Sequence, residues 1–199
     1  MCQKEGVDVC FEPTAQAMYP NGFQTVVTLP TVTHRWEGEI RPHHFSGVAT
    51  VVTKLFGIVR PQVALFGQKD FQQSALVQQL VKDLNLGVEM VVCPTVRETD
   101  GLAMSSRNVY LSLEDRKRAV TLYKSLRAGA EVIRRGVTDG KAVQLAMAHV
   151  LKKEPAITID YLALCDPSTL EPLCDVTSRV VLFGAVRIGS VRLIDNLLV

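Results

Sequence analysis

The chain has 199 residues, of which 47% are hydrophobic and 21% are charged, which is typical of a folded protein with a sizeable core and too apolar for a disordered chain. Its 22 basic and 20 acidic side chains leave a formal net charge of +2, so we expect neither nucleic acid nor a membrane surface as a partner. No apolar run approaches the ~18 residues that a membrane-spanning helix needs.

The first 43 residues predict two short strands in an otherwise irregular segment. The runs at 7–11 and 25–29 are rich in β-prone residues and are bounded by turn signals. The stretch 31–43 is polar, and we interpret it as a surface loop.

The segment from residue 45 to residue 95 alternates helices with strands. Apolar residues spaced by three and four predict a helix from residue 45 that Pro61 ends, and a second helix that starts near Asp70. The apolar runs 63–66 and 88–93 are short enough to be buried parallel strands. This alternation predicts an α/β fold with a parallel sheet. Because few strands are present, residues 1–95 look like the back half of a doubly wound domain.

After residue 95 the pattern changes to helices followed by strands. Ser112-x-x-Asp115 resembles a capping box, and the helix that it opens ends at Gly136. A second helix covers roughly 139–153. Strand-like runs follow at three places: 157–164, 180–186 and 190–194. We therefore predict a small α+β domain over residues 96–199, with a domain boundary near residue 95.

The cysteines and histidines give no sign of a disulfide framework or a metal site. The five cysteines are widely spaced without a C-x-x-C pair, and no secretory signal is visible, so we expect reduced, mostly packed thiols in a cytoplasmic protein. His43 and His44 are adjacent, but no cysteine or carboxylate at helical spacing completes a site. We predict no metal ligands, and a histidine that is packed or hydrogen-bonded to a ligand near the start of a helix.

The run Phe66-Gly67-Gln68-Lys69-Asp70-Phe71-Gln72-Gln73 is the first candidate site. Gly67 lies where a buried strand meets a helix, which is where α/β proteins bind ligands. Backbone N–H groups at the helix start attract phosphate, and Lys69 adds a mobile charge. Asp70 could cap the helix or bind a sugar hydroxyl, while Gln72 and Gln73 could hydrogen-bond a small polar substrate. The alternative is an ordinary strand-to-helix turn with a capping Asp and solvated side chains.

The loop 101–108 is the second candidate site. Ser105 and Ser106 supply hydroxyls that can donate to phosphate oxygens, and Arg107 can bind a phosphate with two parallel hydrogen bonds. A loop that joins two domains can also close over a substrate. The alternative is a polar linker with a helix cap nearby.

Four motifs together resemble the pantothenate synthetase (pantoate–β-alanine ligase) family, and the resemblance covers essentially all 199 residues. They are Arg41-Pro42-x-His44-Phe45 with the helix that follows, Phe66-Gly67-x-Lys69-Asp70-x-Gln72-Gln73, Asp100 to Leu111, and Arg192-Leu193-Ile194-Asp195-Asn196. The resemblance implies a Rossmann-like nucleotidyltransferase domain, incomplete here, followed by a small C-terminal domain that closes over the site, and a homodimer. It also implies an ATP- and Mg²⁺-dependent ligase. Pantoate attacks ATP to give pantoyl adenylate and pyrophosphate, and β-alanine then displaces AMP to give pantothenate.

The resemblance also implies a role for individual residues. The ATP site would consist of Gly67, Gln68, Lys69, Asp70, Val96, Met104, Ser105, Ser106 and Arg107. Pantoate would be held by Gln73 against an apolar wall of Val51, Val52 and Phe66. Lys69 and Arg107 would be the catalytic charge stabilisers, because negative charge builds on the phosphates as pyrophosphate leaves.

The chain also departs from the family pattern. His43 stands where the family usually has Gly, Gln68 replaces a common Glu, and the family's first third, with its His-x-Gly-His motif, is missing. We therefore weigh three hypotheses: an active ligase, a catalytically incomplete fragment without activity of its own, and a related nucleotidyltransferase acting on another acid or nucleotide. An incomplete sheet would also expose an unpaired strand edge and promote aggregation.

Overall fold

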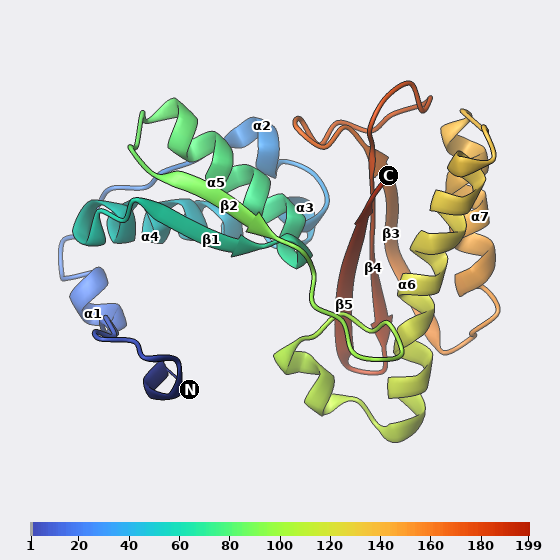
Figure 1. The fold of residues 1–199 in the computed structure, drawn as a ribbon, viewed down its shortest axis with the longest axis horizontal. Helices are drawn as coiled ribbons and strands as arrows, with labels where there is room; N and C mark the ends of the chain where they lie inside the picture. The colour runs from blue at the N-terminus through green and yellow to red at the C-terminus, as the bar shows by residue number, and fades with distance from the viewer. Residues whose placement is uncertain (1) are drawn as a thin grey trace.

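Two sheets hold the strands of the computed structural model, which describes residues 2–199 (Figure 1). The first sheet is parallel and pairs β1 (Val63–Gly67) with β2 (Glu89–Cys93). The second is antiparallel, in the order β3-β4-β5, with the bounds Ile157–Cys165, Val181–Ile188 and Val191–Leu198. The predicted α/β fold class is confirmed, and all five strands expected after residue 45 are present.

Two long helices accompany the parallel sheet, as predicted. They are α4 (His44–Val59) and α5 (Phe71–Asp83), and the short η2 (Gln68–Asp70) joins β1 to α5. Helix α4 ends at Arg60, which has a positive φ of 51° and precedes Pro61, and a residue before proline disfavours helical backbone. The turn that carries Lys69 begins directly after the end of β1, as the sequence predicts.

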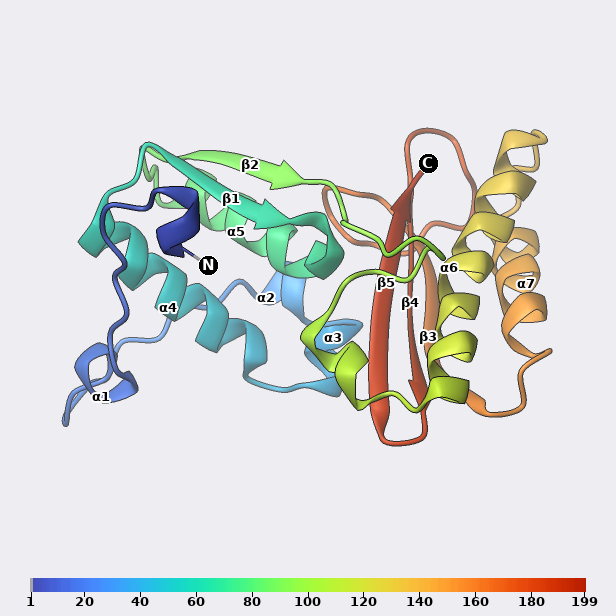
Figure 2. The same cartoon turned by 60° about the horizontal axis from the view of Figure 1, so that its bottom comes forward.

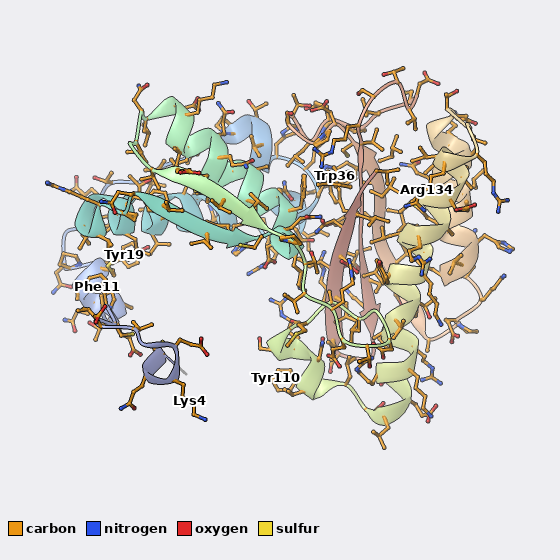
Figure 3. All side chains as sticks on the ribbon, viewed as in Figure 1. Lys4, Phe11, Tyr19, Trp36, Tyr110 and Arg134 are labelled. Carbon is orange, nitrogen blue, oxygen red and sulfur yellow. The ribbon has the colours of Figure 1, made fainter. Side chains whose placement is uncertain are left out.

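The predicted strands at 7–11 and 25–29 are wrong. Neither run forms a strand, and Val9 is 82% exposed. The segment instead has single helical turns: η1 (Cys2–Glu5), α1 (Ala15–Met18), α2 (Pro30–Thr33) and α3 (Glu37–Ile40). Figure 3 shows Phe11 and Tyr19 on this outlying part. A β-prone run forms a strand only where a partner pairs with it, and within residues 2–62 none does. The interpretation of 31–43 as a loop also misses α2 and α3.

The second half begins with η3 (Ser106–Tyr110) and continues into two predicted helices, α6 (Leu113–Arg134) and α7 (Gly140–Leu151). The capping box is confirmed, because the Ser112 Oγ accepts from the Asp115 backbone N at 3.1 Å and donates to its Oδ2 at 2.8 Å. Both long helices lie against one face of the β3–β5 sheet (Figure 2).

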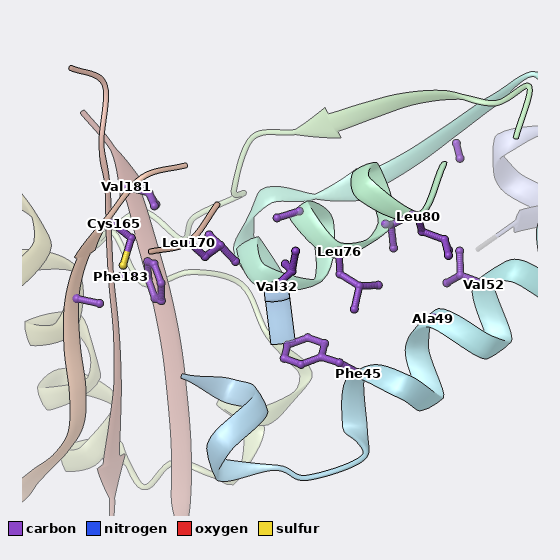
Figure 4. Close-up of a cluster of buried hydrophobic side chains, with 14 of the residues drawn as sticks. Val32, Phe45, Ala49, Val52, Leu76, Leu80, Cys165, Leu170, Val181 and Phe183 are labelled. Carbon is purple, nitrogen blue, oxygen red and sulfur yellow. The ribbon is translucent and has the colours of Figure 1, made fainter. Parts of the chain in front are cut away.

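The opposite face of that sheet packs against the first half of the chain. One buried cluster contains Phe45 of α4, Leu76 and Leu80 of α5, and Val181 and Phe183 of β4 (Figure 4). The two sheets are not hydrogen-bonded to each other, but this hydrophobic core contains residues of both and joins them. The domain boundary near residue 95 stays a prediction.

The cysteines are all free, but the expectation that they are mostly packed is wrong. Cys165 is buried and Cys93 half-buried, whereas the other three are exposed. Burial raises the pKa of the Cys165 thiol to about 12. Among residues 2–199, no helix combines the length and the apolar character that crossing a membrane requires.

Candidate active site

An open pocket with about 550 Å³ of empty space lies where the first half of the chain meets the β3–β5 sheet. Its walls come from the start of α4, the turn between β1 and α5, η3, and all three strands of the second sheet. It brings together four of the predicted site residues, Lys69, Asp70, Gln73 and Arg107. The two sequence motifs that supply them are thus adjacent in space.

Lys69 and Arg107 also share a second, smaller pocket with Ser105. Within residues 2–199 neither cation makes an ion pair. Asp70 occupies the N-cap position of α5, but its side chain makes no capping hydrogen bond, contrary to one interpretation of the sequence. Arg41, on the same wall, also makes no ion pair within residues 2–199, so the pocket holds three unpaired cations and one unpaired carboxylate, which suits a polyphosphate with its counterion.

Gln72 and Gln73 have different roles. The Gln72 side chain is buried and fully hydrogen-bonded, because its Oε1 accepts from the Glu37 backbone N at 3.2 Å and its Nε2 donates to the Val32 and Arg35 carbonyls at 2.9 and 3.0 Å. Gln72 also lines the pocket, but these bonds engage both ends of its amide, and its contact with a substrate stays a prediction. Gln73 is half-buried on the pocket wall, which supports the prediction that it is the substrate-binding glutamine.

The loop before η3 is folded back on itself. The Met104 backbone N donates to the Val96 carbonyl at 2.9 Å, and an isolated bridge joins Arg97 to Ala103. Ser105 then caps η3, its Oγ accepting from the Arg107 backbone N at 3.2 Å. That bond leaves the hydroxyl proton free to be donated to a ligand.

Arg116 of α6 holds this loop by hydrogen bonds to two of its carboxylates. Arg116 donates to Glu98 at 2.6 Å and to Asp100 at 2.7 Å. These hydrogen bonds lower the pKa of both carboxyls below their ordinary values. Arg116 lies in a run of charged residues on a helix, and because such runs are usually solvated, no sequence pattern indicates its role.

The remaining predicted ATP-site residues lie outside the 550 Å³ pocket. Val96, Met104 and Ser106 are exposed on the folded loop, and Gly67 is exposed at the end of β1. Gln68 turns toward β5, where its Nε2 donates to the Asn196 Oδ1 at 3.1 Å. Contacts of these residues with ATP stay predictions.

The predicted apolar wall belongs to the core. Val52 is buried in the cluster of Figure 4, and Val51 and Phe66 pack against it. None of the three lines the 550 Å³ pocket. Their contact with pantoate stays a prediction.

A buried ion-pair network forms part of the pocket wall, to which Glu37 and Tyr161 contribute. Glu37 is 7% exposed and accepts two hydrogen bonds from Arg192, at 2.6 and 2.7 Å, and one from the Tyr161 hydroxyl at 2.9 Å. Arg192 also donates to Asp160 at 2.6 Å. Burial opposes the charge of Arg192, but the bonds to Glu37 and Asp160 outweigh it and raise its pKa. Burial, followed by the nearby Glu37 charge, raises the pKa of Tyr161.

His44 is the first residue of α4 and lies on the pocket wall. Its ring packs against Phe45, and its Nε2 lies 3.3 Å from a guanidinium nitrogen of Arg41. Burial, followed by the Arg41 charge, lowers the pKa of His44 below 6.5. Both effects favour the neutral form of the ring. Within residues 2–199, no three His, Cys, Asp or Glu side chains are grouped to hold a metal ion.

The chain matches known enzymes along nearly its whole length. The family model described as pantoate-beta-alanine ligase matches residues 1–198. The pantothenate synthetases of Caldicellulosiruptor bescii and Acetivibrio thermocellus are 50% and 49% identical over 199 residues, which is 100% of this chain and 71% of each relative.

Solved structures show the same arrangement. The pantothenate synthetase of Thermus thermophilus aligns with a TM-score of 0.94 at 48% identity, over 98% of this chain and 71% of that one. The pantoate-beta-alanine ligase of Francisella tularensis, in a complex with beta-gamma ATP and β-alanine, aligns with a TM-score of 0.74 at 33% identity, over 99% of this chain and 67% of that one.

Proposed function

Because the chain belongs to the pantoate-beta-alanine ligase family, we propose that it joins (R)-pantoate to β-alanine with consumption of ATP. The Francisella relative is described in complex with an ATP ligand and β-alanine, which supports these two as substrates. The single observation that carries the proposal is the pocket that Lys69, Arg107 and Gln73 line together, the two cations both without an ion pair.

In the first step the pantoate carboxylate attacks the α-phosphorus of ATP. A carboxyl O–P bond forms, the bond to pyrophosphate breaks, and pantoyl adenylate remains. Negative charge builds on the leaving phosphates, and fixed cations aimed at them lower the barrier. Lys69 and Arg107 supply those cations, while Gln73 holds pantoate so that its carboxylate is in line.

In the second step the neutral amine of β-alanine attacks the acyl carbon of the adenylate. A C–N bond forms, the bond from that carbon to the AMP oxygen breaks, and AMP and pantothenate leave. The amine loses one proton in this step. His44 lines the pocket, and its lowered pKa favours the neutral ring, so the ring can accept that proton when Nε2 gives up its contact with Arg41.

Magnesium enters this scheme as part of the substrate. Mg²⁺ commonly takes one or two carboxylates together with phosphate oxygens, and Asp70 is the pocket carboxylate without an ion pair. Because residues 2–199 form no three-ligand metal cluster, we assign no step to the ion. The proposed setting is the cytoplasm, in keeping with five free cysteines, and the proposed assembly is a homodimer.

The test is AMP release by the purified chain with ATP, Mg²⁺, pantoate and β-alanine, omitting each acid or amine in turn. We expect release that needs both, and losses on the order of 100-fold in Lys69→Ala and Arg107→Ala, since each removes one charge stabiliser. Asn21→Asp, an exposed change far from the site, is the control. Release without pantoate would contradict the proposal and favour a nucleotidyltransferase with another substrate.

A second candidate function is a catalytically incomplete fragment. The chain spans 71% of its Caldicellulosiruptor relative, and some site residues lie outside the pocket. This candidate predicts ATP binding that depends on Lys69 and Arg107 without AMP release. Calorimetric titration of ATP beside the release assay separates the two candidates.

A further inference from the structure

Asn196 on β5 makes its side-chain hydrogen bonds to the turn that carries Lys69. It is 1% exposed. Its Nδ2 donates to the backbone carbonyls of Gln68 at 2.8 Å and Lys69 at 2.9 Å, and its Oδ1 accepts from the Gln68 Nε2 at 3.1 Å. Both amide protons and the amide oxygen are thus used, and the three bonds fix η2 against the second sheet.

Asp195, the preceding residue, holds the other cation-bearing segment. It is 4% exposed and accepts two hydrogen bonds from Arg97, at 2.6 and 2.9 Å. Arg97 in turn donates to the Gly101 carbonyl at 3.1 Å and lies 3.7 Å from the centre of the Tyr123 ring. These contacts fix the base of the folded loop that leads into Arg107.

We propose that Asp195 and Asn196 are positioning residues that hold Lys69 and Arg107 at a fixed separation across the pocket. Lys69 lies in η2 and Arg107 in η3, two segments that are far apart in the chain. Two adjacent, buried residues of one strand bind both segments. A shift of about 1 Å in a reacting group can cost on the order of 100-fold in rate, so a rigid common anchor has a large effect on catalysis.

The residue types fit this role. Only a neutral amide can donate two protons to two carbonyls while accepting a third bond. Only a carboxylate can take both arms of the Arg97 guanidinium. The inference rests on the proposed function for its catalytic meaning, but the geometry can be tested without substrate.

The first experiment reads the environment of the Lys69 amine directly. Lysines are dimethylated with ¹³C, and the Lys69 resonance is identified by its loss in Lys69→Ala. We expect Asn196→Asp, which keeps the shape but loses a donor, to shift or sharpen this resonance and leave the other lysines unchanged. If Asn196→Asp fails to fold, Gln68→Ala is the substitute. It removes one of the three hydrogen bonds, and we expect a smaller change in the Lys69 resonance. An unmoved Lys69 resonance in folded variants overturns the proposal. Asn21→Asp is the matched control.

The second experiment tests the Asp195 half in the same way. Asp195→Asn keeps the side-chain shape but weakens the pair with Arg97, and we expect it to move the Arg107 Nε–Hε resonance. No change at Arg107 in folded protein overturns this half.

If the unmodified chain releases AMP, a double-mutant cycle with Asn196→Asp and Lys69→Ala links the geometry to catalysis. We expect Asn196→Asp to lower kcat by 10- to 100-fold with a smaller change in KM. In the Lys69→Ala background, we expect the same substitution to lower kcat by no more than twofold. Equal losses with and without Lys69 indicate a merely structural role and overturn the proposal. A chain that releases no AMP refutes the active-ligase function, while the Lys69 resonance still decides the positioning role.

Discussion

Replacing Glu37 by Met tests the buried ion-pair network in the pocket wall. The change removes the partner of two Arg192 hydrogen bonds and one Tyr161 hydrogen bond. Breaking a buried ion pair by deleting one partner costs about 3–5 kcal/mol. Arg192 keeps Asp160 at 2.6 Å, so we expect the low end, about 3 kcal/mol of unfolding free energy. In a chain of this size that corresponds to a melting temperature lower by about 6–12 °C.

The double variant Glu37→Met/Arg192→Met makes the reasoning refutable. With both charges gone, neither Glu37 nor Arg192 leaves the other buried alone, and Asp160 keeps Arg187 at 3.0 Å. Apolar replacements of such pairs are often neutral. We therefore expect the double variant to lose at least 2 kcal/mol less than the sum of the single losses, roughly the size of a strong coupling. Urea unfolding of the wild type, both single variants and the double variant measures this. Additive losses, or a loss below about 1 kcal/mol in Glu37→Met, would refute the ion-pair account.

Three further predictions concern a helix cap, a loop glycine and a histidine. Ser112→Ala removes the capping oxygen of α6 and should cost about 1 kcal/mol in urea unfolding. Gly101→Ala should cost about 1–3 kcal/mol, because Gly101 has a φ of 98° and an added Cβ would lie 2.8 Å from the Tyr123 ring. His44→Gln should flatten the fall in stability below pH 6.5. The folded pKa of His44 lies below 6.5, so acid protonates the unfolded chain first and destabilises the fold.

Each of these predictions has a matched control. Ser112→Thr keeps a hydroxyl and should retain most of the cap. Gly136→Ala shares the positive φ of Gly101 but meets no atom within 4 Å, so it measures backbone strain without the clash. His149→Gln makes the same change at an exposed histidine. Equal effects of a test variant and its control would contradict the corresponding account.

Local patterns predicted the regular elements after residue 45 well. Helix α4 has a long apolar stripe and a proline just beyond its end, and α6 has a capping box, so both are specified by neighbouring residues. The runs at 7–11 and 25–29 look equally β-prone, but a strand needs a partner that no local pattern reveals. Local patterns therefore overestimated the strand content of the first third of the chain.

The site was predictable only in part. The turn at Lys69 and the loop at Arg107 are recognisable by their glycine, charge and hydroxyl content, and the structure places both on one pocket. Gln72 and Gln73 are neighbours about 100° apart on a helix, so only packing decides which one faces the core. Glu37 pairs with Arg192 across 155 positions, and no pattern in the chain indicates such a distant contact.

The shared core of Figure 4 has a mechanical consequence. A hinge that swung the first half of the chain away from the β3–β5 sheet would expose Phe45, Leu170 and Phe183 to water, at about 25 cal/mol for each Å² of apolar surface. The segment around η3 is held far more lightly, since Val109 and Tyr110 are 78% and 75% exposed. Because the base of this loop is fixed at Asp195, we expect ligands to enter and leave by motion of the far end of η3, around Val109 and Tyr110, over a stiff floor.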